Sequence, residues 1–166
     1  AWGYTGGRVN YKERGLGVLL VFLLMGVMLV GGSYYTVTGH CSIEVFWLSL
    51  PFSLLSSLLL LSNELRDYEA DLESGIRTLS VRLGYQFGVR LYFALTAALY
   101  LICALLYWQG LLPGILLVLL TVLAMWSPVK CLAGSRQQRI ALTPLTGRFY
   151  MVFGIVYMAT LWMNLP

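Results

Sequence analysis

Charged residues are scarce in this chain. Only 11% of the 166 residues are charged, whereas 59% are hydrophobic, and there are seven acidic residues and a single histidine. A soluble domain of this length has no interior large enough to hide so much apolar surface. The three cysteines show neither a CxxC nor a Cys/His ligand spacing, so they indicate neither a zinc site nor a disulfide framework. The composition therefore indicates an integral membrane protein.

Long apolar runs take the place of charge. Five of them approach the length that crosses a hydrocarbon core about 30 Å thick. Inside lipid every backbone N–H and C=O must be paired, and helices satisfy this requirement within one segment. We therefore predict an all-α fold, a polytopic helix bundle in the lipid bilayer. The predicted spans are residues 15–36, 42–62, 87–108, 110–127 and 148–165.

The sequence also predicts where two of the spans end. Gln109 and Gly110 alone are expected to join the third and fourth spans in a tight hairpin. Ser127-Pro128 is expected to end the fourth span, and Thr143-Pro144 to mark a further turn before the fifth.

The basic residues are confined to alternate connections. All eleven precede the first span, lie between the second and third spans or in the first turn of the third, or lie between the fourth and fifth spans or at the first residue of the fifth. These segments share one side of the membrane, which the positive-inside rule places in the cytoplasm. We predict a multi-pass protein of the cell (inner) membrane, with the N-terminus inside and the C-terminus outside. This topology accounts for the net charge of +4, so no nucleic-acid partner is predicted.

A predicted cytoplasmic cap, residues 63–86, holds five of the seven acidic residues. On a helix Asn63, Asp67 and Asp71 follow one another at i, i+4 and i+8, so neighbours lie about 5–6 Å apart on one face. Two carboxylates at that separation repel by about 3 kcal/mol at an effective dielectric constant of 20. Mg²⁺ relieves this repulsion and shares itself with substrate phosphates. The spacing predicts a Mg²⁺ site in a helical turn that begins at Asn63 and that Gly75 ends.

The same stretch is also typical of a solvated helix with internal salt bridges. Glu64, Glu69 and Glu73 are predicted to form such a solvated face. Arg77 and Arg82 follow closely and favour the metal reading, because carboxylates that hold Mg²⁺ together with arginines are a recurring way to bind a diphosphate.

Residues 63–71 (NELRDYEAD) and 75–84 (GIRTLSVRLG) resemble the second aspartate-rich motif of the UbiA superfamily of intramembrane prenyltransferases. Within it they are most similar to the menaquinone-pathway branch that uses 1,4-dihydroxy-2-naphthoate. Residues 4–7 (YTGG) and 14–17 (RGLG) resemble two more stretches of that branch, and residues 142–145 (LTPL) a third.

The resemblance implies a fold of nine spans with two aspartate-rich motifs. This chain matches spans five to nine and the second motif. The first motif and the N-terminal half of the enzyme are expected to precede Ala1, so the chain alone is expected to be inactive. Ile76 stands where the family usually has a lysine, which removes one phosphate contact.

The resemblance further implies transfer of a polyprenyl group from its diphosphate to an aromatic acceptor, 1,4-dihydroxy-2-naphthoate in this branch, with Mg²⁺ as cofactor. Interfacial anchoring is the other reading of the candidates near the N-terminus. The candidate residues are Asp67 and Asp71 as catalytic metal ligands, Asn63, Arg77, Arg82 and Lys12 as diphosphate contacts, and Tyr4 and Tyr11 as substrate contacts.

Three alternatives stay open from the sequence. The acceptor could be that of another superfamily member, such as a hydroxybenzoate, haem or chlorophyllide. The chain could instead be a non-catalytic membrane assembly protein whose acidic helix docks a basic partner. A transporter ranks last, because it requires ionisable residues within the spans and the apolar cores contain essentially none.

Overall fold

The computed structural model describes Tyr11 and residues 14–163 of the chain, and the regular structure of this part is entirely helical. The prediction of an all-α bundle with five membrane-spanning helices is confirmed. The five helices that are long and apolar enough to cross a membrane are Gly17–Thr38, Ile43–Arg66, Tyr85–Trp108, Ile115–Leu132 and Arg136–Trp162.

Several of these long helices are assembled from shorter segments. The first consists of α2 (Gly17–Val21), the π-helical segment η1 (Phe22–Met28) and α3 (Leu29–Thr38), and the second is α4 (Ile43–Arg66). Two short helices, α5 (Tyr68–Glu73) and α6 (Leu79–Leu83), precede the third, α7 (Tyr85–Trp108). The fourth joins α8 (Ile115–Leu120), the 3₁₀ segment η2 (Thr121–Met125) and α9 (Trp126–Leu132), and the fifth joins α10 (Arg136–Arg139) and α11 (Leu142–Trp162).

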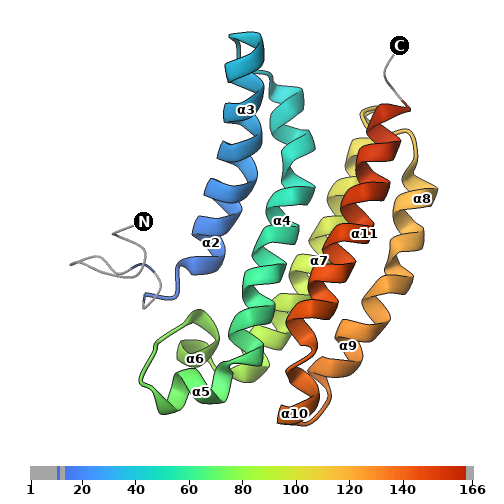
Figure 1. The fold of residues 1–166 in the computed structure, drawn as a ribbon. Helices are drawn as coiled ribbons and strands as arrows, with labels where there is room; N and C mark the ends of the chain where they lie inside the picture. Colours follow the sequence, from blue (N-terminus) through green and yellow to red (C-terminus); the bar gives the residue numbers. More distant parts are fainter. Residues whose placement is uncertain (1–10, 12–13, 164–166) are drawn as a thin grey trace.

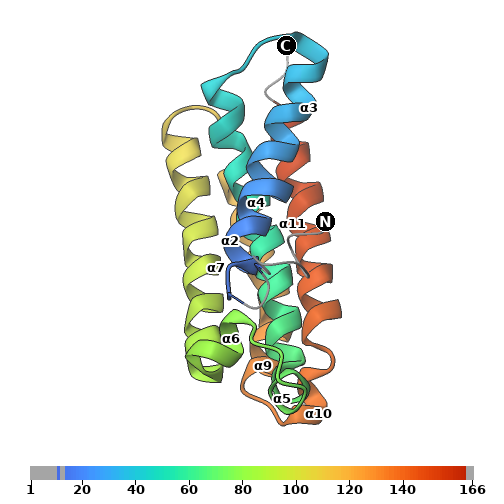
Figure 2. The same cartoon turned by 90° about the vertical axis from the view of Figure 1, so that its left-hand side faces the viewer.

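Successive long helices run in opposite directions, so their connections alternate between two ends of the bundle (Figure 1). We call the end that carries α5, α6 and α10 the charged end. α4 occupies the middle of the bundle, with α2 and η1 on one side and α7 and α11 on the other. Figure 2 shows α2 and α3 lying in front of α4. α8 and α9 pack against α11, at the opposite side of the bundle from α2 and α3 in Figure 1.

Small residues allow α4 its central place. Ser49, Ser53 and Ser57 recur at every fourth position and are all buried. The hydroxyl of Ser57 donates to the carbonyl of Val18 at 3.0 Å and so ties α4 to α2. Opposite Ser53 lies Gly26 of η1, where an added Cβ would come within 2.4 Å of the Cα of Ser53. The two helices therefore touch at a distance that only glycine permits.

Tyrosines fill the interior between α4, α7 and α11, and their hydroxyls are paired. Tyr92 shares a hydrogen bond of 2.8 Å with Thr146. Tyr157 donates to the carbonyl of Leu48 at 3.0 Å and stacks on Phe153. These bonds satisfy polar atoms that would otherwise be costly to bury.

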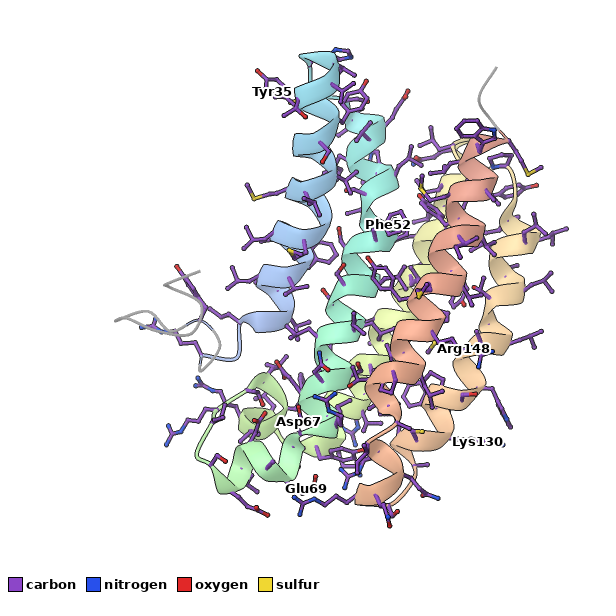
Figure 3. The ribbon with its side chains drawn as sticks, viewed as in Figure 1. Tyr35, Phe52, Asp67, Glu69, Lys130 and Arg148 are labelled. Carbon is purple, nitrogen blue, oxygen red and sulfur yellow. The ribbon has the colours of Figure 1, made fainter. Side chains whose placement is uncertain are left out.

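The outer faces of the bundle are apolar. Leu24, Leu123 and Ile155 are 50%, 77% and 68% exposed, and many other large apolar side chains point outward as they do (Figure 3). A continuous apolar exterior of this kind is suited to contact with lipid chains.

The connection between α7 and α8 is longer than predicted. It runs from residue 109 to residue 114 instead of consisting of Gln109 and Gly110 alone. Leu112 within it is fully buried. The chain turns its apolar residues back into the bundle before α8 begins, and this burial lengthens the connection.

The predicted proline turns are wrong. Pro128 lies in the first turn of α9, which carries the fourth span on to Leu132, and Pro144 lies in the first turn of α11. Proline is tolerated there because its fixed φ suits the first turn of a helical segment. The 3₁₀ segment η2 ends just before α9 and so makes Pro128 an early position of a new helix.

Candidate functional site

The aspartate motif begins inside α4. The helix continues to Arg66, so no new turn starts at Asn63 as predicted. The interruption falls at Asp67, whose backbone has φ −93° and ψ 7°, and α5 starts at the next residue. Hydrogen bonds still cross the break: the Asp67 N–H donates to the Asn63 carbonyl at 3.0 Å, and the Asp71 N–H donates to the Asp67 carbonyl at 2.8 Å. The structure therefore brings the three residues together, but on two helices instead of one.

The Asp67 carboxylate already forms an ion pair with the side chain of Arg66. Its two oxygens accept hydrogen bonds from Nε and Nη2 of Arg66 at 2.8 and 2.6 Å. The two side chains are 33% and 43% exposed, respectively, for Arg66 and Asp67, and Figure 3 labels Asp67 at the charged end. A forked arginine pair fixes the carboxylate in one orientation. Because the pair is accessible to solvent, opening or widening it has a small free-energy cost.

Glu64 belongs to the interior and not to a solvated face, so that prediction is wrong for it. The side chain is only 7% exposed. Its Oε2 accepts hydrogen bonds from the backbone N–H and the hydroxyl of Ser80, at 3.2 and 3.3 Å. Glu64 thereby holds α6 against α4, and Gly88 of α7 leaves room for Ser80 at this point.

Glu69 and Glu73 differ from each other in their exposure to solvent. Glu69 forms an ion pair with Arg139, and its side chain is 28% exposed, which contradicts the predicted solvated face. Glu73 is 71% exposed and lies 3.6 Å from Arg136, as a solvated residue does. Arg139 has no local signal in the sequence, because it lies 70 residues from its partner.

Of the remaining candidates, the structure describes Arg77, Arg82 and Tyr11. Arg77 and Arg82 are exposed at the charged end. The side chain of Arg82 runs beside Gly15, where an added Cβ would lie 3.4 Å from Cδ of the arginine. Tyr11 is 37% exposed. The candidates Tyr4 and Lys12 lie outside the described residues.

An apolar groove opens next to these arginines. It has a volume of about 400 Å³ and lies between α2, α4, α6 and α7. Leu79 of α6 lines the groove near the charged end of the bundle. The walls of the groove are formed by Val18, Phe22, Leu54 and Leu95. A groove of this shape accommodates an apolar chain whose polar head stays at the charged end.

The donor set fits Mg²⁺. Among the residues that the structure describes, no three His, Cys, Asp or Glu side chains gather into a complete metal cage. Mg²⁺ does not need one, because it is usually held by one or two carboxylates, waters and substrate phosphates. Asp67 and Asp71 supply hard oxygen donors one helical turn apart. A carboxylate offers about four lone-pair positions, so Asp67 has capacity beyond the bonds from Arg66.

Comparison with known proteins adds relatives to this geometry. One is a 1,4-dihydroxy-2-naphthoate octaprenyltransferase of Mycobacterium leprae, 34% identical over 80% of this chain and 40% of the relative. Another of the same name, from Haemophilus influenzae, is 36% identical over 63% of this chain and 33% of the relative. The human UbiA prenyltransferase domain-containing protein 1 is 32% identical over 92% of this chain and 46% of the relative. No solved structure matches the chain significantly.

Two facts set the scope of this similarity. The chain spans less than half of the length of these relatives. Residues 1–163 match the UbiA prenyltransferase family, which is nearly the entire chain. The chain therefore belongs to the UbiA prenyltransferase family.

Proposed function

We propose that this chain carries the second aspartate motif of a Mg²⁺-dependent intramembrane prenyltransferase. Its substrates are a polyprenyl diphosphate and an aromatic acceptor, 1,4-dihydroxy-2-naphthoate, as the names of two relatives suggest. The observation that carries the proposal is the placement of Asp67 and Asp71 one turn apart, where the apolar helix α4 ends at the charged end. The rest of the site would be supplied by residues that correspond to the remaining length of the relatives.

The proposed roles follow from the chemistry of each group. Asp67 and Asp71 would hold the metal, and Asn63 would orient them or reach the diphosphate. Bound Mg²⁺ would neutralise the charge that builds up on the leaving diphosphate. Arg77 and Arg82 would stabilise the same charge from the other side.

The reaction breaks the bond between C1 of the prenyl group and the diphosphate oxygen, and the electron pair leaves with the diphosphate. A ring carbon of the acceptor forms the new bond, and the acceptor loses its carboxylate as carbon dioxide. The groove lined by Leu54, Leu79 and Leu95 supports this proposal, because its apolar walls would hold the prenyl tail and exclude water from the allylic carbon.

The proposed orientation places the charged end on the cytoplasmic side of the cell (inner) membrane. The support is the distribution of basic residues, because Arg77 lies on the connection between α5 and α6, and Lys130 and Arg136 lie in α9 and α10, all at this end. A diphosphate made in the cytoplasm would then reach the aspartate motif directly.

The test uses the full-length protein that contains this chain, in detergent, with prenyl diphosphate, acceptor and Mg²⁺. Asp67→Asn and Asp71→Asn are each expected to lower turnover by about a hundredfold or more, while the protein stays in the membrane. Glu73→Gln is the matched control, because Glu73 is an exposed acid of the same motif, and it is expected to stay within about twofold. Near-normal rates for both aspartate variants would make the motif a structural helix.

The 166-residue chain by itself is expected to show no transfer under the same conditions. Robust turnover by this chain alone would contradict the proposal that the site is shared with further sequence.

A further inference from the structure

A largely buried ion pair ties together two connections at the charged end. Glu69 of α5 accepts a hydrogen bond from Nη2 of Arg139 of α10, and Figure 3 labels Glu69 at this end of the bundle. The side chains of Arg139 and Glu69 are only 11% and 28% exposed. The guanidinium also lies over the ring of Tyr85 of α7, 4.6 Å from its centroid. Helices α5, α7 and α10 therefore meet at one largely buried cation.

Tyr85 makes this junction rigid. Its hydroxyl donates to the carbonyl of Leu132 at the end of α9, at 3.1 Å. The ring of Tyr68, the first residue of α5, packs edge-on against it with centroids 5.5 Å apart. Arg139 is thus held against a ring that is fixed from both neighbouring connections.

Neither partner of the ion pair has a full set of other hydrogen bonds that could compensate its charge. Arg139 Nε and Glu69 Oε2 are buried and have no hydrogen-bond partner within the described part of the chain. Each charged group depends on the other for compensation. Removing one of them leaves a buried charge without its partner, which costs more than removing both.

A second pair joins the same two helices but is exposed to solvent. Glu73 of α5 lies 3.6 Å from Arg136 of α10, and the two side chains are 71% and 60% exposed. Exposed pairs of this kind contribute little to the position of a helix. The chain therefore contains its own control for the buried pair.

The buried pair lies on the opposite side of α5 from the proposed metal ligand. Glu69 precedes Asp71 by two residues, which corresponds to a rotation of about 200° around the helix axis. The fastening of Glu69 to Arg139 thus leaves the other side of α5 to Asp71. The pair also fixes α5, whose first backbone hydrogen bond is accepted by the Asp67 carbonyl.

We propose that Glu69 and Arg139 are positioning residues that set the orientation of α5 and, through it, the separation of Asp67 and Asp71. The connection between α9 and α11 would then control the geometry of the aspartate motif without contacting the substrate. This inference rests on the proposed function, because it assigns the pair a role in prenyl transfer.

The experiment compares single and double variants of the two pairs in the full-length protein, reconstituted in lipid nanodiscs. Hydrogen exchange of the amides of residues 68–76 reports on α5 without reference to activity. Glu69→Gln and Arg139→Met are each expected to speed this exchange by about tenfold, and the double variant by less than the product of the two. Glu73→Gln and Arg136→Gln are expected to change it by less than about twofold.

Steady-state transfer is measured on the same samples. The Mg²⁺ concentration for half-maximal rate is expected to rise several-fold in the two single variants of the buried pair and to stay constant in the control variants. Exchange of α5 that is unchanged in both Glu69→Gln and Arg139→Met would overturn the inference. Faster exchange with an unchanged Mg²⁺ dependence would also overturn it, because the pair would then be structural only.

The two proposals fail in different ways. A full-length wild-type protein without any transfer would contradict the proposed function, whereas the exchange data would still decide whether the pair holds α5. An active protein whose buried-pair variants behave like the Glu73 and Arg136 controls would contradict the positioning role alone.

Discussion

The most apolar of the five long helices is also the least buried. In Gly17–Thr38 only 17% of the most apolar window is buried within the protein, whereas in α4 the corresponding share is 56%. In water the more apolar segment would be expected to occupy the core. In a bilayer lipid competes equally well for apolar surface, so association depends on close packing and on hydrogen bonds between helices. The serines of α4 provide both.

The comparison between the first long helix and α4 is most strongly tested at Gly26, where the two helices touch. Gly26→Ala would bring a Cβ within 2.0 Å of the Ser53 hydroxyl and 2.4 Å of its Cα, so η1 must move away from α4. We expect a loss of about 3 kcal/mol in the free energy of unfolding, measured in mild detergent by denaturant titration. Gly31→Ala is the control, because nothing lies within 4 Å of a Cβ there. Equal stability of the two variants would show that the contact is not made.

A second test compares leucines of the two helices. Leu58 of α4 is 1% exposed, and Leu24 of η1 is 50% exposed. Leu58→Ala removes packed contacts and leaves a cavity, so we expect a loss of about 2 kcal/mol in the free energy of unfolding. Leu24→Ala is expected to cost less than about 0.5 kcal/mol, because lipid replaces the lost contacts. The same titration measures both, and a larger effect at Leu24 would reverse the assignment of α4 as the central helix.

The smallest expected effect concerns one hydrogen bond. Ser57→Ala removes the bond to the Val18 carbonyl and is expected to cost about 0.6 kcal/mol in the free energy of unfolding, the average for such bonds in a membrane. Ser33→Ala is the control, since Ser33 is exposed and bonds only to the carbonyl of Leu29 in its own helix. An effect of Ser57→Ala no greater than that of Ser33→Ala would mean that packing alone holds α2 against α4.

The spans were predictable from the sequence because length and hydropathy are local properties, and bilayer thickness converts them into helices. The helix ends were less predictable. Pro128 and Pro144 indicate turns to a sequence reader, but each occupies the first turn of a helical segment, where proline is tolerated. The structure, and not the sequence, decides which side of a helix boundary a proline occupies.

The candidate site shows the same limit. The spacing of Asn63, Asp67 and Asp71 predicted residues one helical turn apart, and backbone hydrogen bonds join them at that interval, although across two helices. It gave no information on Glu69, whose partner Arg139 comes from a distant connection. Glu64 was misassigned because a carboxylate counts as solvated until a buried donor, here Ser80, is known to face it.

At the helix break, the backbone carbonyl and the carboxylate of Asp67 have two different roles. Its carbonyl anchors the first backbone bond of α5, whereas its carboxylate is held by the side chain of Arg66. Asparagine at this position would keep the backbone carbonyl but would lose the negative charge and one of the two oxygens that accept from Arg66. A defect in that variant would therefore report on the carboxylate, because the backbone hydrogen bond that begins α5 would be unchanged.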